Sequence, residues 1–581
     1  MCCPRKSVPG LPVFKCAEFA REIISFDHQD DIKALNLGKV FHMHHKENQE
    51  VKLDSKSLCS HTFITGSTGS GKSNTVYQML SEIKKTNVNF LVVEPAKGEY
   101  KNVFGQNENN DDCDVHVYGT NPSISNLLRI NPFSFPNGND DVTKNIHILE
   151  HLDRLVEIFN VCWPMYAAMP AVLKEAVEKS YEDCGWNLTE SSNKYGKDLY
   201  PTFADVTRNI RTIIDSSEYD AENKGAYKGA LITRLKSLSN GINGLVFTTD
   251  ELSDEDLFDK NVIVDLSRVG SPETKSLIMG LLVLKLQEHR MTSGEMNASL
   301  KHVTVLEEAH NLLKRTSTEQ SQDSGNLLGK SVEMLTNAIA EMRTYGEGFI
   351  IADQAPGLLD MAVIRNTNTK IIMRLPDLGD RELVGKAANL NDNQIEELAK
   401  LPTGVAAVYQ NNWIQPVLCK VDKVEQPSNI KYEKKKENNT EKKEFSESQK
   451  IDIAKLLFYG TALPSSFVKE LSKYNISGRS MKIIIDINDK VEHKKFDKQD
   501  TENSVVLSEL YSDISDTMLQ ISNKTTNFDE LLIAYEPLLA NVIEDEELRK
   551  GIFTTLIVNL FINELHNSEM LEKWKNQYMV R

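Results

Sequence analysis

The sequence predicts an α/β fold with a parallel-rich sheet, an all-α insertion and a C-terminal helical domain. Between residues 36 and 425, short β-branched runs alternate with helical stretches, which is typical of a buried parallel sheet covered by helices. Strand signals are missing from about 145 to 245, where apolar residues recur at helical spacing instead. Residues 451–581 have helical patterns and little Gly or Pro. The length of 581 residues fits two or three such folding units.

The strand candidates of the core are short and rich in β-branched residues. Helical stretches separate most of them, and crossovers between parallel strands are almost always right-handed, so an α/β sandwich is expected. The six clearest candidates are Phe90–Val93, Val115–Tyr118, Val262–Asp265, Val303–Leu306, Phe349–Ala352 and Lys370–Met373.

Shifts in composition divide the chain into four parts. Residues 1–35 are a mixed lead-in, and residues 36–425 form the core with its helical insertion at about 145–245. Residues 426–450 have few apolar side chains and mix lysines with glutamates, so they are expected to be a solvated, charged linker. Residues 451–581 follow as the small helical domain, for which partner docking is the expectation by elimination.

Composition predicts a soluble, cytoplasmic protein without a membrane span. No apolar run reaches the roughly 18–20 residues that a span needs, and the N-terminus lacks an apolar signal core. The eight cysteines are scattered without a CxxC pair, which is typical of free thiols in a reducing compartment. The net charge of −17 counts against a nucleic-acid binder, although a ring needs positive charge only on its lumen.

The most specific motif of the chain is a glycine-rich loop of the pattern GxxxxGK[ST]. It follows a predicted strand, His61–Thr65, and opens a predicted helix at Asn74, the context in which such a loop binds phosphate. Lys72 is expected to contact the β- and γ-phosphates of ATP, and the Ser73 hydroxyl to ligate Mg²⁺. The predicted nucleotide-binding residues are Gly66, Ser67, Thr68, Gly69, Ser70, Gly71, Lys72, Ser73 and Asn74.

Two further strands end in polar residues that suit nucleotide hydrolysis. Glu307 and Glu308 follow the strand Val303–Leu306, and we assign Glu307 to the metal shell and Glu308 to the general base. Alternatively, both acids cap the following helix. Gln354 follows the strand Phe349–Ala352 and is expected to bond the γ-phosphate and the attacking water, unless it is only a turn residue at the strand end.

Two arginines are candidates for stabilising transition-state charge across a subunit boundary. Arg343 precedes the strand that ends near Gln354, and Arg374 follows the strand that begins at Lys370. An intramolecular salt bridge or an exposed position fits either residue equally well. The sequence does not choose between them.

Several motifs together resemble one family. They are the P-loop, the segment Val93–Tyr100 (Val-Glu-Pro-Ala-Lys-Gly-Glu-Tyr), Ile130–Phe133, the box Glu307–His310, and Arg343–Gly346. Their order over residues 36–425 is similar to that of the HerA/FtsK superfamily of ring-forming P-loop ATPases, and most of all to bacterial HerA-type proteins. The resemblance implies a RecA-like core in a homohexamer that translocates double-stranded DNA as a helicase-type motor.

The same resemblance implies partners and residue roles. HerA relatives work with a nuclease or with a sirtuin-like effector, in DNA-end processing or in antiviral defence. By carry-over, Lys72 and Ser73 bind nucleotide, Glu307 and Glu308 serve metal and water, Gln354 senses phosphate, and Arg343 or Arg374 reaches a neighbouring site; Glu99 resembles a family acid near the nucleotide.

The sequence departs from the family in two places. Glu307 stands where the family usually has Asp, which changes geometry more than role. Only 65 residues precede Gly66, without a run of alternating strands, so the β-barrel that HerA proteins carry there is expected to be absent or reduced, or the chain to be a shortened form.

Two functions of different classes follow. The leading hypothesis is an ATP-hydrolysing hexameric DNA translocase that is the motor of a nuclease- or effector-containing complex. The alternative is a nucleotide-dependent ring scaffold that organises and activates an effector enzyme without translocating DNA. The net charge and the missing barrel favour the alternative.

Overall fold

The computed structural model describes most of the chain. The described residues are 17–23, 34–105, 114–137, 145–163, 165–195, 199–293, 295–315, 327–425, 432–434, 443–496, 500–522, 528–540, 543–564 and 568–578. Most of the predicted lead-in and of the predicted linker lies outside these ranges.

Within the described residues, twelve strands form one sheet, and eight of them are parallel. In spatial order the parallel strands are β12 (Thr369–Ile372), β3 (Thr62–Thr65), β11 (Glu347–Asp353), β10 (His302–Glu307), β4 (Asn89–Glu94), β9 (Asn261–Asp265), β5 (Val115–Gly119) and β6 (Asn126–Leu127). The six strand candidates of the sequence all lie in this sheet, so the predicted α/β fold with a parallel-rich sheet is confirmed.

Four antiparallel strands extend the sheet beyond β12. They are β13 (Val405–Gln410), β14 (Val417–Val421), β1 (Ala34–His42) and β2 (His45–Asp54), of which β2 is the edge. The sequence shows no run of alternating strands ahead of the predicted strand His61–Thr65, so β1 and β2 were missed. β2 could not be predicted from the sequence, because its first six residues are polar and largely exposed and the strand therefore lacks an alternating apolar pattern.

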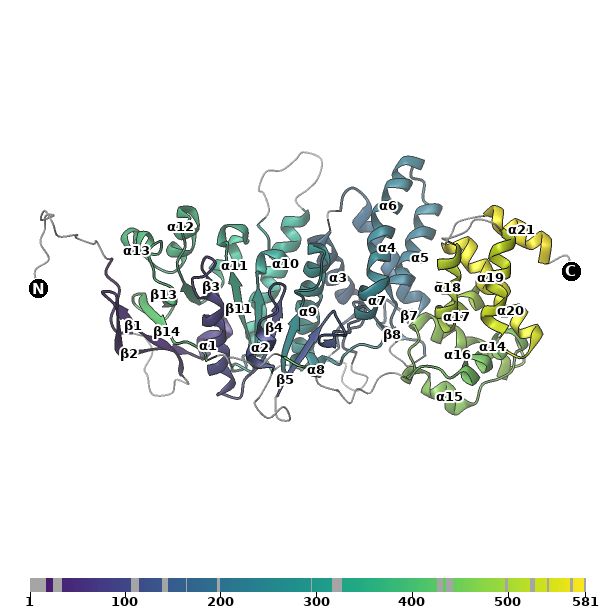
Figure 1. Ribbon diagram of the computed structural model, residues 1–581, viewed down its shortest axis with the longest axis horizontal. Helices are drawn as coiled ribbons and strands as arrows, with labels where there is room; N and C mark the ends of the chain where they lie inside the picture. The colour runs from purple at the N-terminus through teal and green to yellow at the C-terminus, as the bar shows by residue number, and fades with distance from the viewer. Residues whose placement is uncertain are drawn as a thin grey trace, which may run out of the picture.

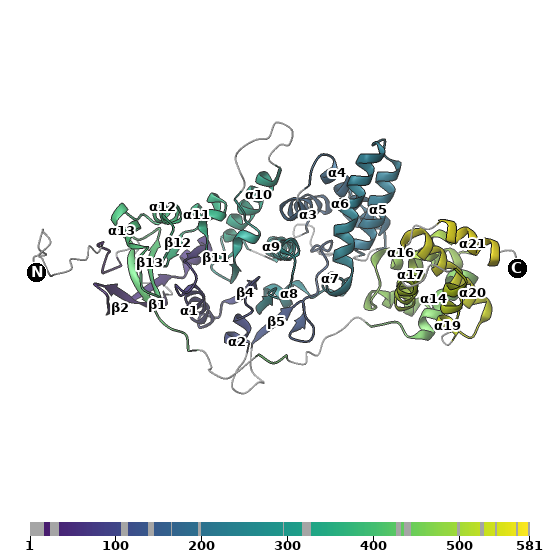
Figure 2. The same ribbon diagram turned by 45° about the horizontal axis from the view of Figure 1, so that its top comes forward.

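Helices cover both faces of the sheet, because alternate strand residues point to opposite sides. Val92, Val305 and Ile350 pack in one core with α1 (Lys72–Lys84) and the strands β1 and β14. Leu91, Leu306 and Ile351 pack in a second core with α9 (Pro272–Ser293) and α10 (Leu327–Glu341). In Figure 2, α1 and α2 (Tyr100–Phe104) lie on the opposite side of the strands from α10 and α11 (Met361–Arg365). The short helices α8 (Asp254–Phe258), α12 (Leu378–Ala387) and α13 (Asp392–Glu397) complete the core.

The predicted insertion is helical apart from one small hairpin. Its helices are α3 (Ile148–Cys162), α4 (Met169–Asp183), α5 (Phe203–Ser216), α6 (Ala221–Ser239) and α7 (Gly241–Val246). The hairpin joins β7 (Trp186–Asn187) to β8 (Ser192–Asn193) between α4 and α5. Trp186 within it is buried and packs in the hydrophobic core that the insertion helices share.

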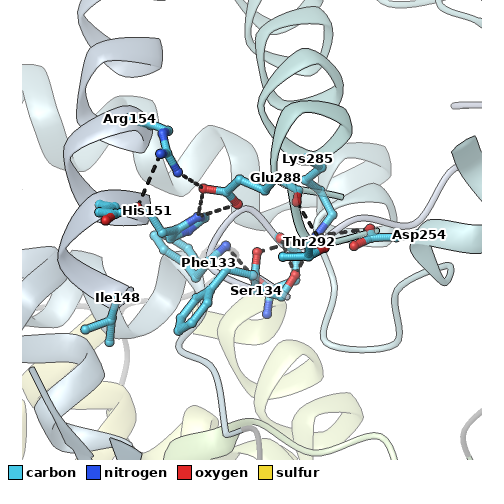
Figure 3. A network of polar contacts seen from close by, with 12 residues as sticks. Phe133, Ser134, Ile148, His151, Arg154, Asp254, Lys285, Glu288 and Thr292 are labelled. Atoms are coloured by element: carbon cyan, nitrogen blue, oxygen red, sulfur yellow. Dashed lines mark hydrogen bonds and ion pairs between the residues drawn. The ribbon is translucent and has the colours of Figure 1, made fainter. Parts of the chain in front are cut away.

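A buried polar network fastens the insertion to the core (Figure 3). Glu288 of α9 is fully buried and accepts hydrogen bonds from His151 and Arg154 of α3, at 2.9 and 3.3 Å. One turn earlier on α9, the buried Lys285 donates to the hydroxyl of Ser134 at 2.7 Å. Ser134 follows the segment Ile130–Phe133, so this family-like motif has a packing role in the structure.

The C-terminal residues form a helical region that packs on the insertion. Its helices are α14 (Glu447–Tyr459), α15 (Ser465–Glu470), α16 (Gly478–Glu492), α17 (Asp500–Leu510), α18 (Ser512–Ser522), α19 (Phe528–Ala540), α20 (Glu546–Asn559) and α21 (Ser568–Tyr578). The hydroxyl of Tyr195 donates to Asp486 at 2.5 Å, and a Cβ at Gly478 would lie 2.7 Å from the Tyr200 carbonyl oxygen. Figure 1 shows these helices at the end of the molecule away from β1 and β2, with α4–α6 between. Within the described residues, no helix is both long and apolar enough to cross a membrane.

Candidate active site

The glycine-rich loop joins the carboxyl end of β3 to the first turn of α1. Gly71 has φ +108, a left-handed conformation that residues with a Cβ rarely adopt. A Cβ on Gly66 would lie 2.6 Å from Ser70 Oγ and 2.7 Å from Met373 Cβ, so only glycine fits there. The loop is anchored because Ser67 N donates to the Arg374 carbonyl and Gly404 N to that of Ser70. The loop therefore lies at the carboxyl ends of parallel strands, where open α/β sheets bind ligands.

Four predicted site residues form one chain of contacts at this edge. Lys72 Nζ lies 2.9 Å from Glu308 Oε1, and the same oxygen accepts a hydrogen bond from Gln354 Nε2 at 2.6 Å. The hydroxyl of Thr68 donates to Gln354 Oε1 at 2.7 Å. Lys72 and Glu308 are 6% and 12% exposed, so this ion pair is largely shielded from water. The structure thus brings together the P-loop, the acidic box and the amide that the sequence singled out.

Glu307, the last residue of β10, directly precedes Glu308 and is almost fully buried. Its carboxylate accepts a hydrogen bond from the hydroxyl of Tyr100 at 2.7 Å, and burial raises its pKa. On the next strand, Glu94 accepts from the backbone N–H groups of Glu99 and Tyr100, and burial raises its pKa to about 8. Lys72 and Lys97 are near enough to Glu307 to favour its charged form, but the effect of burial on its pKa is larger.

The residues at hand fit a magnesium ion. Carboxylate and hydroxyl oxygens are its preferred ligands, and Ser73 lies half-buried at the start of α1. A cation beside Glu307 would stabilise its charged form against the burial that raises its pKa. Ser73 and Glu307 therefore remain the predicted metal ligands.

His310 and Asp353 also belong to the site. Asp353 Oδ2 accepts hydrogen bonds from both the backbone N–H and the Nδ1 of His310, each at 2.9 Å. The hydrogen bond to Asp353 raises the pKa of His310. The backbone of Glu308 has φ +45 and ψ +50, a left-handed conformation that is unusual for a residue other than glycine.

Three further predicted residues, Arg374, Arg343 and Asn74, lie outside this chain of contacts. The backbone of Arg374 touches the P-loop, as described above. Arg343 is exposed in the 3₁₀ turn Met342–Tyr345, ahead of the amino end of β11, so the seven-residue strand separates it from Gln354 by about 20 Å. The side-chain amide of Asn74 holds the segment after β14, donating to the carbonyl of Asp422 and accepting from Val424 N.

Three residues of the site escaped assignment from the sequence. Tyr100 lies in the family-like segment Val93–Tyr100, and His310 lies in the acidic box, but neither position revealed its partner. Asp353 directly precedes Gln354. Its place after a buried strand, at the edge that carries the P-loop, is the signal that could have found it.

The parallel sheet, the P-loop and the acids beside it define a P-loop ATPase. Residues 35–286 match the family model described as "Helicase HerA, central domain". The chain is therefore a P-loop ATPase with a HerA-type central domain in this stretch, and the predicted resemblance to the HerA/FtsK superfamily is confirmed.

Similar proteins agree with this assignment. The DNA double-strand break repair helicase HerA of Sulfurisphaera tokodaii is 23% identical over 381 residues, covering 65% of this chain and 67% of the relative. The protein of the same name from Sulfolobus acidocaldarius is 24% identical over 382 residues, covering 65% and 68%. Among solved structures, VirB4 of Thermoanaerobacter pseudethanolicus aligns with a TM-score of 0.50 at 16% identity, covering 68% of this chain and 98% of that protein, a likeness of fold.

Proposed function

We propose that this protein is an ATP-hydrolysing hexameric ring that translocates double-stranded DNA, as the motor subunit of a complex with a nuclease or another effector enzyme. The observation that carries the proposal is the contact chain of Lys72, Glu308 and Gln354 at the carboxyl edge of the sheet. The names of the relatives, DNA double-strand break repair helicases, support DNA as the substrate and DNA-end processing as the setting. Antiviral defence is the other setting that the resemblance of the sequence implies.

The side chains divide the work of hydrolysis. Lys72 and the P-loop N–H groups bind the phosphates, and Mg²⁺ held by Ser73 and Glu307 would neutralise charge on them. Glu308 takes a proton from the attacking water, because it is the carboxylate beside Lys72. Gln354, which bonds both Thr68 and Glu308, reports the state of the phosphate to β11.

The position of Arg343 supports the ring. This side chain is exposed, and the length of β11 separates its backbone from Gln354 by about 20 Å. An arginine that stabilises transition-state charge must touch the phosphates, so Arg343 suits the site of a neighbouring copy. Arg374, whose backbone carbonyl anchors the P-loop, is the alternative.

Catalysis and assembly are tested together. Lys72→Ala is expected to abolish ATP hydrolysis, and electron microscopy with nucleotide is expected to show six-fold rings. Arg343→Ala should hydrolyse slowly alone, and adding the Lys72→Ala variant should restore activity by supplying Arg343 in mixed rings. A monomer that hydrolyses ATP at the full rate would contradict the ring.

The second candidate function is a nucleotide-dependent ring scaffold that activates an effector without translocating DNA. The net charge of −17 favours it. Duplex DNA binding should be measured at about 50 mM and 200 mM salt, since electrostatic binding is strong at low salt and weakens steeply. Binding and stimulation of hydrolysis at low salt support the translocase, whereas their absence, alone and with the effector, supports the scaffold.

A further inference from the structure

We propose that His310 and Asp353 form a positioning pair that sets the orientation of the general base Glu308, an inference that rests on the hydrolytic mechanism proposed above. Neither residue need touch the nucleotide in this role. Both act through the short turn that carries the base.

The backbone of Glu308, the general base, has a conformation that neighbouring contacts must stabilise. Glu308 is the residue between the end of β10 and the 3₁₀ turn Ala309–Asn311, and its φ of +45 is unfavourable for a side chain with a Cβ. Such a conformation persists only where neighbouring contacts fix it. The contacts around the turn therefore decide where the Glu308 carboxylate points.

Asp353 supplies two of those contacts, and the side-chain amide of Asn311 supplies another by donating to the Glu308 carbonyl at 2.8 Å. Asp353 is fully buried at the end of β11, and its Oδ2 captures residue 310 twice, at the backbone N–H and at Nδ1. Its Oδ1 accepts a hydrogen bond from Ala355 N at 2.9 Å. One carboxylate thus joins the turn after β10 to the turn after β11, which carries Gln354. Asp353 therefore fixes the position of Glu308, the base, relative to Gln354, the phosphate-sensing amide.

His310 also faces the base itself. Its Nδ1 lies 3.7 Å from Glu308 Oε2, while Glu308 Oε1 is bonded to Lys72 and Gln354. When Lys72 turns to the phosphates of ATP, it releases Glu308, and the imidazole is then the polar neighbour on the opposite side of the carboxylate. His310 limits how far the base can move toward the phosphates.

A cation site is the competing interpretation of this cluster. Ligand atoms of Glu308, His310 and Asp353 all lie within 4.8 Å of one another. However, Nδ1 of His310 is bonded to Asp353, and Oε1 of Glu308 is bonded to the Lys72 ammonium. An Nδ1 that donates its proton to Asp353 has no lone pair for an ion, and Glu308 Oε1 already faces the positive charge of Lys72, so orientation is the better account.

The test compares His310→Ala with His310→Asn in the full-length protein. The Asn amide nitrogen can occupy the position of Nδ1 and donate to Asp353, whereas Ala cannot. Turnover is normalised to the number of nucleotide-binding sites, measured with a fluorescent ATP analogue, so that misfolded protein does not count. His45→Ala, a histidine exposed on the edge strand β2, is the matched control.

We expect His310→Ala to lower normalised kcat by roughly 10- to 100-fold with KM for ATP changed less than about twofold, since a small misplacement of a catalytic group slows the reaction without weakening binding. His310→Asn should recover most of the loss, and His45→Ala should match the wild type. The inference is overturned if normalised kcat of His310→Ala stays within twofold, if Asn is as impaired as Ala, or if excess Mg²⁺ restores the Ala variant. Absence of hydrolysis by the wild type would instead refute the proposed function.

Discussion

Replacing Glu308 with Gln is expected to have opposite effects on nucleotide binding and on hydrolysis. In the structure, Glu308 and Lys72 form a shielded ion pair at 2.9 Å, so phosphates must take Lys72 away from Glu308. Gln can still accept a hydrogen bond from the charged Lys72, worth about 1.5–3 kcal/mol, but it loses the attraction between opposite charges. Weakening the competing contact by about 1 kcal/mol should tighten nucleotide binding roughly fivefold, because 1.4 kcal/mol is tenfold.

Hydrolysis should change in the other direction. A general base contributes about 10²- to 10⁴-fold to the rate, and Gln cannot accept the proton, so kcat should fall by that factor. Steady-state phosphate release measures kcat, and titration with a fluorescent ATP analogue in EDTA measures affinity without metal effects.

Glu307→Gln is the matched control, since Glu307 is bonded to Tyr100 and not to Lys72. It should slow hydrolysis through the metal but leave affinity in EDTA unchanged. If Glu308→Gln binds nucleotide no more tightly than the wild type, the ion pair does not compete with ATP. Unchanged turnover would show that Glu308 is not the base.

Three further predictions follow from single contacts. Tyr100→Phe removes the hydrogen bond to Glu307 and should raise the Mg²⁺ concentration for half-maximal hydrolysis about tenfold; an unchanged requirement would exclude a metal role for Glu307. Burial lowers the pKa of Lys370 to about 8 from the ordinary 10.5, so the unfolded chain binds more protons between these values and stability should rise with pH there. Lys370→Met should abolish that rise in melting curves and stabilise the protein at pH 7 by up to roughly 3 kcal/mol, and a parallel pH dependence in both proteins would refute this. Glu288→Ala leaves the buried His151 without its partner and should destabilise the fold by about 3–5 kcal/mol in urea unfolding, and a loss below about 1 kcal/mol would count against a structural role for the network.

The sequence predicts those parts of the site whose signals are contiguous. The P-loop and the acidic box each follow a buried strand, so their pattern and their place at the sheet edge could be inferred together. The contact between His310 and Asp353 could not, because it depends on the pairing of β10 with β11, in which Glu307 lies beside Ala352. Strand order in a parallel sheet is set by tertiary packing, so it cannot be predicted from the local sequence of either strand.

The same limit explains the misjudged N-terminal strands. Residues of β2 such as Lys46 and Glu50 have low strand propensity, and their pairing with β1 is established only in the folded sheet. Asn74 shows the opposite case, in which a residue of a recognised motif has a contact that the motif does not predict. It lies where a nucleotide contact is expected from the motif, yet its amide holds the chain after β14, a contact between residues more than 340 positions apart.

The charged edge strand has a consequence for assembly. β2 ends the sheet and carries the charged residues Lys46, Glu47, Glu50 and Lys52, and charged edges discourage the addition of another strand. Neighbouring copies are therefore not expected to share a continuous sheet, whose backbone hydrogen bonds would lock adjacent subunits in one register. In the proposed ring, contacts made by side chains alone would let each subunit tilt against the next, as sequential hydrolysis around the ring requires.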